Sequence, residues 1–331
     1  MTKREAFLRI YLAALLLALA GMGLIIAPAT GAERPARPAY GLISTPVADA
    51  RTQAAVQSER VTQAIMGTPV EIEGEEGDWW RVKIPAQGDY PGWIKKTDVV
   101  PVPDVAKYWR AFQKVAVVTD SFTPVRARPA GDGAVVESLP IGSRVGLMGE
   151  GGDGNRQNSG EGNAAWYNVS LPDGRIGWVA GSAAQLVPSE VSFTDQGKHL
   201  QFGKPGSSLV DRVIATARLW LGADYVWGGM SPRGFDCSGF TYTAFWLNGV
   251  ILPRDAAPQF KAAVPVKREE MRPGDLVFFS TYGPGPTHVG IYLGDGFFIN
   301  AKSTRSGVVI SRLGEPYFAE KFLGARRPPG L

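Results

Sequence analysis

The chain has 331 residues, of which 44% are hydrophobic and 20% are charged, so it can bury apolar cores and lacks the composition of a disordered polyelectrolyte. Its net charge of +4 is too small to predict nucleic-acid binding, and basic residues do not cluster with aromatic ones. One cysteine and two histidines exclude an internal disulfide and a metal site built from cysteines or histidines, so we expect no cofactor.

Residues 1–32 have the pattern of an export signal. Lys3, Arg4 and Arg9 precede an uncharged apolar run at 10–27, and small residues follow it at 27–32. An uncleaved anchor is the alternative, since a run of this length could nearly span a bilayer. We expect cleavage, and a mature protein that works in the periplasm, in the cell wall or outside the cell.

A stretch rich in proline, alanine and arginine at 33–46 is predicted to be a linker, and an internal repeat follows it. Three short segments recur in one order: a glycine with a valine three residues on, Trp or Trp-Trp with a valine, and Gly-Trp-aliphatic. They stand at 67–70, 79–82 and 92–94 in the first copy, and at 142–145, 166–169 and 177–179 in the second. Alternating apolar residues between turn signals predict short antiparallel strands in both copies.

This pattern resembles bacterial SH3-like domains, which are common in cell-wall enzymes. The resemblance predicts two small all-β barrels, the first at 47–103 and the second at 104–188. A glycine- and asparagine-rich stretch at 149–165 lengthens the second copy and is predicted to be a surface loop.

A second linker is predicted at 189–206, before a third domain at 207–331. Helical spacing predicts a helix from Leu209 to Trp220, and a second helix is expected from Cys237 to Leu247. Strand-like runs follow at 275–279, 289–293 and 297–301. Helices followed by antiparallel strands define an α+β layout.

Cys237 lies at the start of the second predicted helix, directly after Asp236, which is a good N-cap residue. Exposed amides and the helix dipole in this first turn are expected to lower the pKa of the thiol toward neutrality. A buried, inert cysteine is the alternative. The position at a capped helix start in an exported protein favours a nucleophile.

A thiolate nucleophile needs a base that can later protonate the leaving amine. His199 lies in a polar stretch between domains, whereas His288 opens an apolar strand, so His288 is the predicted base. Asn300 follows a hairpin turn, and in the sequence it is as many residues after Gly294 as His288 is before it. This spacing predicts that Asn300 and His288 lie nearly opposite each other in the hairpin. A side-chain amide can hold an imidazole without a charge, although Asn300 could also be an ordinary polar residue of the strand.

At these residues the sequence resembles the NlpC/p60 cell-wall cysteine peptidases, over about 209–324. Six motifs carry the resemblance: YVWGG at 225–229, DCSGF at 236–240, LPRD at 252–255 with Gln259, PGDLVFF at 273–279, HVGIYLG at 288–294 and INA at 299–301. The resemblance implies a papain-like α+β fold and hydrolysis of peptidoglycan stem peptides, usually after γ-D-glutamate. The third polar residue is most often histidine in this family, and Asn300 in its place could alter the pH profile.

The resemblance also implies roles for neighbouring residues. Tyr225 matches a tyrosine whose hydroxyl helps to bind the oxyanion beside the Cys237 amide, with a core tyrosine as the alternative. Asp236 and Ser238 match residues that hold the free amine of an N-terminal L-Ala in some relatives. Two further residues are expected to line the substrate site: Trp227 and Asp255, with a simple turn residue as the alternative for Asp255.

Two SH3-like domains ahead of this catalytic domain resemble γ-D-glutamyl-L-diamino acid endopeptidases, in which the first such domain partly covers the cleft. An acidic and an aromatic residue from the region of the first barrel should then contact substrate, and Glu73 and Tyr108 are the candidates, with Glu71, Glu75 and Glu76 competing. We therefore expect a secreted, monomeric cysteine endopeptidase that cleaves the γ-D-glutamyl bond to diaminopimelate or lysine in muropeptides. The alternatives are a wall-binding protein with a silent catalytic domain, and a thiol acyltransferase or amidase of the same fold.

Overall fold

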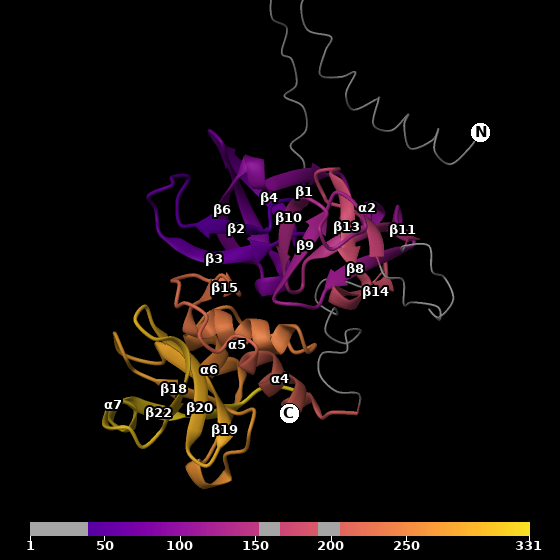
Figure 1. Cartoon of the computed structure of the whole chain (residues 1–331). Coiled ribbons are helices and arrows are strands. Elements are labelled where there is room, and N and C mark those ends of the chain that lie inside the picture. The colour runs from indigo at the N-terminus through magenta and orange to yellow at the C-terminus, as the bar shows by residue number, and fades with distance from the viewer. Residues whose placement is uncertain (1–38, 152–165, 191–205) are drawn as a thin grey trace, which may run out of the picture. The chain divides into compact units, whose positions relative to one another are not determined.

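The computed structural model describes residues 39–151, 166–190 and 206–331 (Figure 1). The predicted export signal, His199 and nearly all of the predicted surface loop lie outside these ranges. None of the helices within the described ranges is both long and apolar enough to cross a membrane. The described residues belong to one compact unit.

The first domain is a seven-stranded antiparallel sheet in the order β3-β2-β6-β5-β4-β1-β7. Its strands are β1 (Tyr40–Ile43), β2 (Val47–Arg51), β3 (Arg60–Ile65), β4 (Pro69–Glu76), β5 (Trp79–Ile84), β6 (Tyr90–Lys95) and β7 (Val99–Val102), with short helical turns η1 (Pro85–Gln87) and η2 (Lys96–Asp98). Because β1 pairs with both β4 and β7, the predicted linker at 33–46 is wrong for residues 40–43, which belong to the sheet.

A short helix, α2 (Val105–Arg110), precedes the second sheet, which therefore starts ten residues after the predicted boundary at 104. The strands of the second sheet are β8 (Lys114–Val118), β9 (Phe122–Arg126), β10 (Val135–Pro140), β11 (Arg144–Gly151), β12 (Trp166–Ser170), β13 (Ile176–Ala180) and β14 (Ala184–Pro188), with the turn η3 (Gly181–Ala183). Their order, β10-β9-β13-β12-β11-β8-β14, repeats that of the first sheet strand for strand.

The repeated glycines explain part of this correspondence. Gly67 and Gly142 precede the fourth strand of their respective sheets, and both have φ of 83°, a left-handed conformation that glycine adopts without steric cost. A Cβ atom on Gly67 would lie 2.6 Å from the backbone oxygen of Arg144, and one on Gly142 would lie 2.8 Å from the Trp246 ring. The two glycines therefore permit close packing as well as the turn.

The third domain is α+β, as predicted. Its helices are α4 (Leu209–Arg218), α5 (Cys237–Trp246), α6 (Ala256–Ala262) and α7 (Pro316–Lys321), and β15 (Met230–Ser231) pairs with β16 (Gly234–Phe235). A six-stranded antiparallel sheet runs in the order β17-β22-β18-β19-β20-β21. These strands are β17 (Val264–Val266), β18 (Leu276–Phe279), β19 (His288–Gly294), β20 (Phe297–Ser303), β21 (Gly307–Arg312) and β22 (Phe322–Arg327), with η4 (Arg268–Glu270).

Helix α5 lies at the centre of this domain, and all ten of its residues are buried. A helix that is buried on every side needs apolar residues all round, and side chains such as Phe240 and Phe245 supply them. The apolar cluster around α5 extends to Trp109 and Ile141 of the preceding segments. The first turn of α5 is thereby held in a fixed position against the sheet.

Candidate active site

The candidate nucleophile, Cys237, is the first residue of α5 and is 4% exposed. Asp236 caps the helix as predicted, because its Oδ1 accepts a hydrogen bond of 2.6 Å from a backbone amide in the first turn. The Sγ of Cys237 lies 3.8 Å from the carbonyl oxygen of Thr287 and also interacts with the Val289 amide. The thiol therefore lies against the backbone on both sides of His288.

Burial determines the protonation state of this thiol. Burial away from water is the larger cause and the Asp236 carboxylate the smaller one, and together they raise the pKa of Cys237 to about 12. The Val289 amide and the Arg254 charge act in the opposite direction. The prediction that the helix start lowers this pKa toward neutrality is wrong, because the loss of hydration outweighs the field of the first turn. At neutral pH the resting group is a thiol.

The candidate base, His288, opens β19 and is 5% exposed. Its Nε2 lies 2.9 Å from the Oδ1 of Asn300. The amide nitrogen of Asn300 donates to the carbonyl oxygen of Val309 at 3.3 Å and to the Oγ of Ser311 at 3.1 Å, which fixes Oδ1 toward the imidazole. Because Oδ1 can only accept, Nε2 carries the ring hydrogen and Nδ1 keeps the lone pair that can take a proton.

Burial also makes the imidazole neutral. Desolvation lowers the pKa of His288 to about 4, against the opposing effect of the hydrogen bond to Asn300, and the positive charge of Lys302 adds to the decrease. Cys237 and His288 therefore rest as a neutral thiol and a neutral imidazole. In such a pair the proton moves from sulfur to nitrogen as the nucleophile attacks.

Asn300 reaches His288 along a diagonal of the β19–β20 hairpin. The register of the hairpin shifts beside Gly294, so Asn300 lies opposite Gly290 and two positions away from His288. The prediction that the two side chains lie nearly opposite each other is therefore wrong in register, although they do meet. A Cβ atom on Gly290 would lie 3.0 Å from that of Asn300, so the absence of a side chain keeps the diagonal path open.

Two hydrogen-bond donors lie beside the thiol. Tyr225 is joined by an isolated β-bridge to Phe235, two residues before Cys237. Burial, and to a smaller extent the charges of Cys237 and Asp236, raise the pKa of the Tyr225 hydroxyl. The hydroxyl therefore stays protonated and can donate a hydrogen bond. The amide of Cys237, in the first turn of α5, lacks an intrahelical acceptor. These two groups suit the negative oxygen of a tetrahedral intermediate.

Two cavities meet at this centre and share the side chains of Tyr225 and Tyr282. The one lined by Cys237, named here the Cys237 cavity, has a volume of about 310 Å³. The one lined by His288, the His288 cavity, has a volume of about 330 Å³. The charged residues that line the Cys237 cavity are all acidic: Glu59, Asp236 and Asp255. Across the described ranges, no group of three histidine, cysteine or acidic side chains could hold a metal ion.

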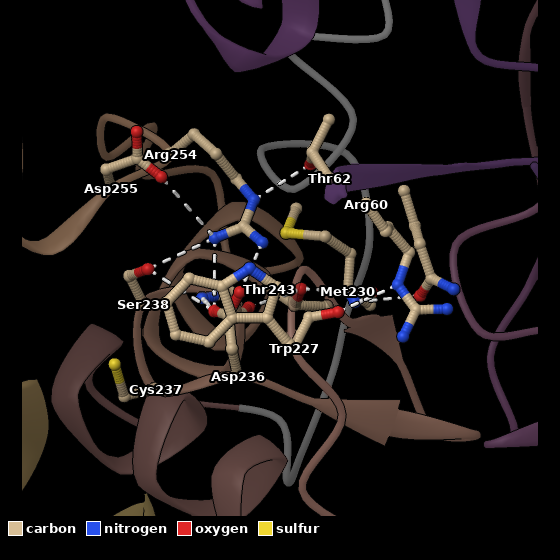
Figure 2. Close-up of polar contacts among 12 residues, drawn as sticks. Arg60, Thr62, Trp227, Met230, Asp236, Cys237, Ser238, Thr243, Arg254 and Asp255 are labelled. Atoms are coloured by element: carbon tan, nitrogen blue, oxygen red, sulfur yellow. Dashed lines mark hydrogen bonds and ion pairs between the residues drawn. The ribbon is translucent and has the colours of Figure 1, made fainter. Parts of the chain in front are cut away.

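Arg254 binds two residues that line the Cys237 cavity, Asp236 and Ser238 (Figure 2). Arg254 is 2% exposed, and its guanidinium donates to both carboxylate oxygens of Asp236, at 2.6 and 3.1 Å, and to the Oγ of Ser238 at 3.1 Å. Its Nε donates to the Oγ1 of Thr62, on β3 of the first sheet, at 2.8 Å. The first sheet thus takes part in positioning the helix cap beside the nucleophile.

The structure brings most of the predicted substrate-site residues together. The following predicted residues line the Cys237 cavity: Tyr225, Trp227, Asp236, Ser238 and Asp255. The Nε1 of Trp227 donates to Glu59 at 2.7 Å. The Nε of Arg60 donates to the Trp227 carbonyl oxygen at 2.7 Å (Figure 2). The loop and strand start at Glu59 and Arg60 therefore reach into the third domain.

Glu73 and Tyr108 do not line either cavity. Glu73 pairs instead with Lys83, at 2.7 Å, across the β4–β5 ladder. Tyr108 lies on α2 and packs against Trp109, with ring centroids 5.0 Å apart. These two predictions are wrong because the first sheet approaches the cavity through β3 and the start of β6, and not through β4 or α2.

The acidic and aromatic residues of the first domain that line the Cys237 cavity are Glu59, in the loop before β3, and Tyr90, at the start of β6. The hydroxyl of Tyr90 donates to Asp255 at 3.0 Å. Sequence reasoning missed both residues, and also the role of Arg254. Only the composition of the LPRD motif hinted at Arg254, because an arginine within a buried segment needs a carboxylate partner.

An uncharged Cys-His-Asn set beside two oxyanion donors defines a thiol-dependent hydrolase centre. Residues 222–327 match the model of the NlpC/P60 family, and residues 46–100 match that of the bacterial SH3 domain. The chain thus contains an NlpC/P60 domain and a bacterial SH3 domain.

Two relatives are similar to this chain over most of its length. The gamma-D-glutamyl-L-lysine dipeptidyl-peptidase of Bacillus cereus (strain ATCC 10987 / NRS 248) is 29% identical over 274 residues, which cover 80% of this chain and 74% of that protein. The protein of the same name from Bacillus subtilis (strain 168) is 28% identical over 279 residues, 80% of each chain. A crystal structure of an NlpC/P60 family protein from Bacillus cereus ATCC 10987 has the same fold, with a TM-score of 0.70, 24% identity, and coverage of 87% of this chain and 99% of that one.

The low pKa of His288 predicts a pH dependence of stability. The unfolded chain binds a proton on this histidine near pH 6.5, whereas the folded chain resists protonation until about pH 4. The free energy of unfolding is therefore unaffected by this group above pH 6.5, and it decreases by on the order of 3 kcal/mol as the pH falls toward 4. Urea unfolding at pH 7 and pH 4.5 measures the change, and His288→Gln should remove it.

His199→Gln is the matched control, because it removes the other histidine of the chain. Titration of carboxylates is common to all three proteins and cancels in the comparison. Equal pH dependence in the wild type and in His288→Gln would contradict the buried, neutral state of His288.

Proposed function

We propose that this protein is a cysteine endopeptidase that cleaves the γ-D-glutamyl bond to a diamino acid in peptidoglycan fragments with a free N-terminal L-Ala. The observation that carries the proposal is the placement of Cys237 and the His288–Asn300 pair beside a cavity whose charged lining is acidic. The named activity of the two Bacillus relatives supports the same bond.

The Cys237 cavity suits an ammonium group. An amine leaving water needs anionic acceptors, and the carboxylates of Glu59, Asp236 and Asp255 all line this one space. A volume of about 310 Å³ is at the lower end of ligand pockets, which is appropriate for a short peptide such as L-Ala-γ-D-Glu. The free amine would lie toward the carboxylates, with the γ-carbonyl carbon at Cys237.

The reaction then follows from the neutral pair. The sulfur of Cys237 bonds to the γ-carbonyl carbon while Nδ1 of His288 takes the thiol proton, and the Tyr225 hydroxyl and Cys237 amide donate to the oxyanion. The protonated imidazole gives its proton to the diamino acid nitrogen as the C–N bond breaks. Water next attacks the thioester with His288 as base, and the thiol is regenerated as L-Ala-γ-D-Glu leaves.

The organisation of the chain suggests how the enzyme is used. The strand order of the second sheet supports its assignment as a second SH3-like domain. The apolar run at 10–27 supports export through a cleaved signal, so that the enzyme meets muropeptides in the periplasm, in the cell wall or outside the cell. We propose that it acts there as a monomer, since one chain supplies every residue of the centre described above.

Incubation of the purified protein with L-Ala-γ-D-Glu-meso-diaminopimelate, followed by mass spectrometry, tests the proposed function. The expected products are L-Ala-γ-D-Glu and free diaminopimelate. Absence of cleavage together with cosedimentation on wall sacculi would support a wall-binding protein instead. A product ligated to an added amine, without hydrolysis, would indicate an acyltransferase.

Amine recognition predicts a strong effect of acetylating the substrate. N-acetylation removes the positive charge and leaves the carboxylates of the Cys237 cavity without a cation, so we expect kcat/KM to fall by about 100-fold. Replacing Glu59 by Gln should reduce the wild type's preference for the free amine by about tenfold. Competition assays with the two substrates measure this preference.

Glu73→Gln is the matched control, since Glu73 is also an acidic residue of the first domain and does not line the cavity. It should keep the wild-type preference. Equal cleavage of free and acetylated substrate by the wild type would contradict amine recognition while leaving the peptidase activity in place.

A further inference from the structure

The two cavities at the active centre carry opposite charge. The lining of the Cys237 cavity holds three carboxylates, of which Asp236 is paired with the buried Arg254, and no lysine or arginine. The lining of the His288 cavity holds no carboxylate, and Lys302 is the one charged side chain among its eight residues, since His288 is neutral at pH 7. A substrate that spans both cavities is therefore expected to have a cationic end and an anionic end.

The chemistry assigns each end of the substrate to a cavity. The leaving nitrogen receives its proton from His288, so the diamino acid must lie on the side of the imidazole, in the His288 cavity. The acyl part, with its free amine, stays on the side of Cys237 and the carboxylates. Tyr225 and Tyr282, which line both cavities, mark the boundary at the scissile bond.

Lys302 is available to a ligand at this position. It lies on β20, its side chain is 33% exposed, and its Nζ is 5.0 Å from the centroid of the Phe318 ring at the cavity wall. Its ion pair with Glu315 is long, at 3.6 Å, and both partners are solvent-accessible, so the pair holds the ammonium only weakly. The charge also reaches the active centre, because it contributes to the lowered pKa of His288.

We infer that Lys302 binds a carboxylate of the leaving diamino acid and so selects substrates that carry one at this position. The inference rests on the proposed function. Two carboxylates could be the partner: the α-carboxylate of a C-terminal diamino acid, and the side-chain carboxylate that diaminopimelate has and lysine lacks. Both present the same chemistry to the ammonium, namely a charge-assisted hydrogen bond.

Three substrates distinguish the two sources. The parent is L-Ala-γ-D-Glu-meso-diaminopimelate, and the others carry a carboxamide in place of the α-carboxylate or of the side-chain carboxylate. With the wild type, amidation of the bound carboxylate should raise KM about tenfold, and amidation of the other should change it by less than about twofold. The affected substrate identifies the partner of Lys302.

Lys302→Met should raise KM for the parent by about the same tenfold and abolish the difference between the parent and the affected amide. Lys302→Arg should keep that difference, which shows that a loss in the Met variant comes from charge and not from misfolding. Lys267→Met is the control, because Lys267 is also paired with a glutamate, at 3.8 Å, and lines neither cavity. It should behave as the wild type.

Equal KM values for the three substrates with the wild type would overturn the role of Lys302. A difference that persists unchanged in Lys302→Met would overturn it as well, since the carboxylate would then bind elsewhere. Cleavage of none of the three substrates would instead contradict the proposed function, and the inference with it.

Discussion

Replacement of Cys237 by alanine is expected to lower kcat/KM on L-Ala-γ-D-Glu-meso-diaminopimelate by about 10⁴-fold or more. The chain has no second cysteine that could take over, and the remaining oxyanion donors give only residual rate enhancement. The fold should persist, since the substitution removes one buried sulfur atom and costs about 1 kcal/mol in free energy of unfolding. Product formation by mass spectrometry and thermal unfolding measure the two effects.

The double variant provides the control for this prediction. His288→Ala should cause a loss similar to that of Cys237→Ala, and the two changes together should cost little more than either alone, because the thiol and the imidazole act as a unit. Losses that multiply in the double variant would contradict the coupled proton transfer. Undiminished cleavage by Cys237→Ala would contradict the nucleophile itself.

Replacing Arg254 by methionine is expected to lower the free energy of unfolding by about 3–5 kcal/mol. The substitution leaves the Asp236 carboxylate buried without its counter-charge and removes the donor to Thr62. Urea denaturation monitored by tryptophan fluorescence measures the change. Activity should fall as well, because Asp236 caps the helix that presents Cys237.

Two further variants separate the buried charge from general damage. Asp236→Asn combined with Arg254→Met should recover part of the lost stability, because neither buried charge is then left unpaired. Arg128→Met is the matched control: Arg128 pairs with Asp132 at 2.7 Å, but both side chains are more than half exposed, so its loss should cost less than about 1 kcal/mol. Equal losses for Arg254→Met and Arg128→Met would contradict the role of the buried pair.

The local features of the site could be predicted from the sequence. The sequence around Asp236 and Cys237 predicts a capped helix start, and His288 lies where an apolar strand begins. Such signals depend on neighbours in the chain, and the structure places the Cys237 thiol against the backbone on both sides of His288. The paired repeats likewise predicted two sheets, whose identical strand order the structure shows.

The remaining features depend on contacts between distant segments. Glu59, Tyr90 and Thr62 approach the third domain from more than 160 positions away in the sequence, and nothing in their local patterns favours them over Glu73 or Tyr108. The direction of the Cys237 pKa shift depends on how completely other segments exclude water from the thiol. The strand β1 was not predicted because it has only four residues and lies next to a proline-rich stretch, whose composition predicts a linker.

The protonated state of Cys237 has a consequence for the durability of the protein. Peroxide and disulfides react with thiolates, and a thiol whose pKa is about 12 presents almost none at neutral pH. With 4% of its surface exposed, the sulfur is also shielded from large oxidants. A single cysteine of this kind can persist in an oxidising compartment without a partner thiol to rescue it.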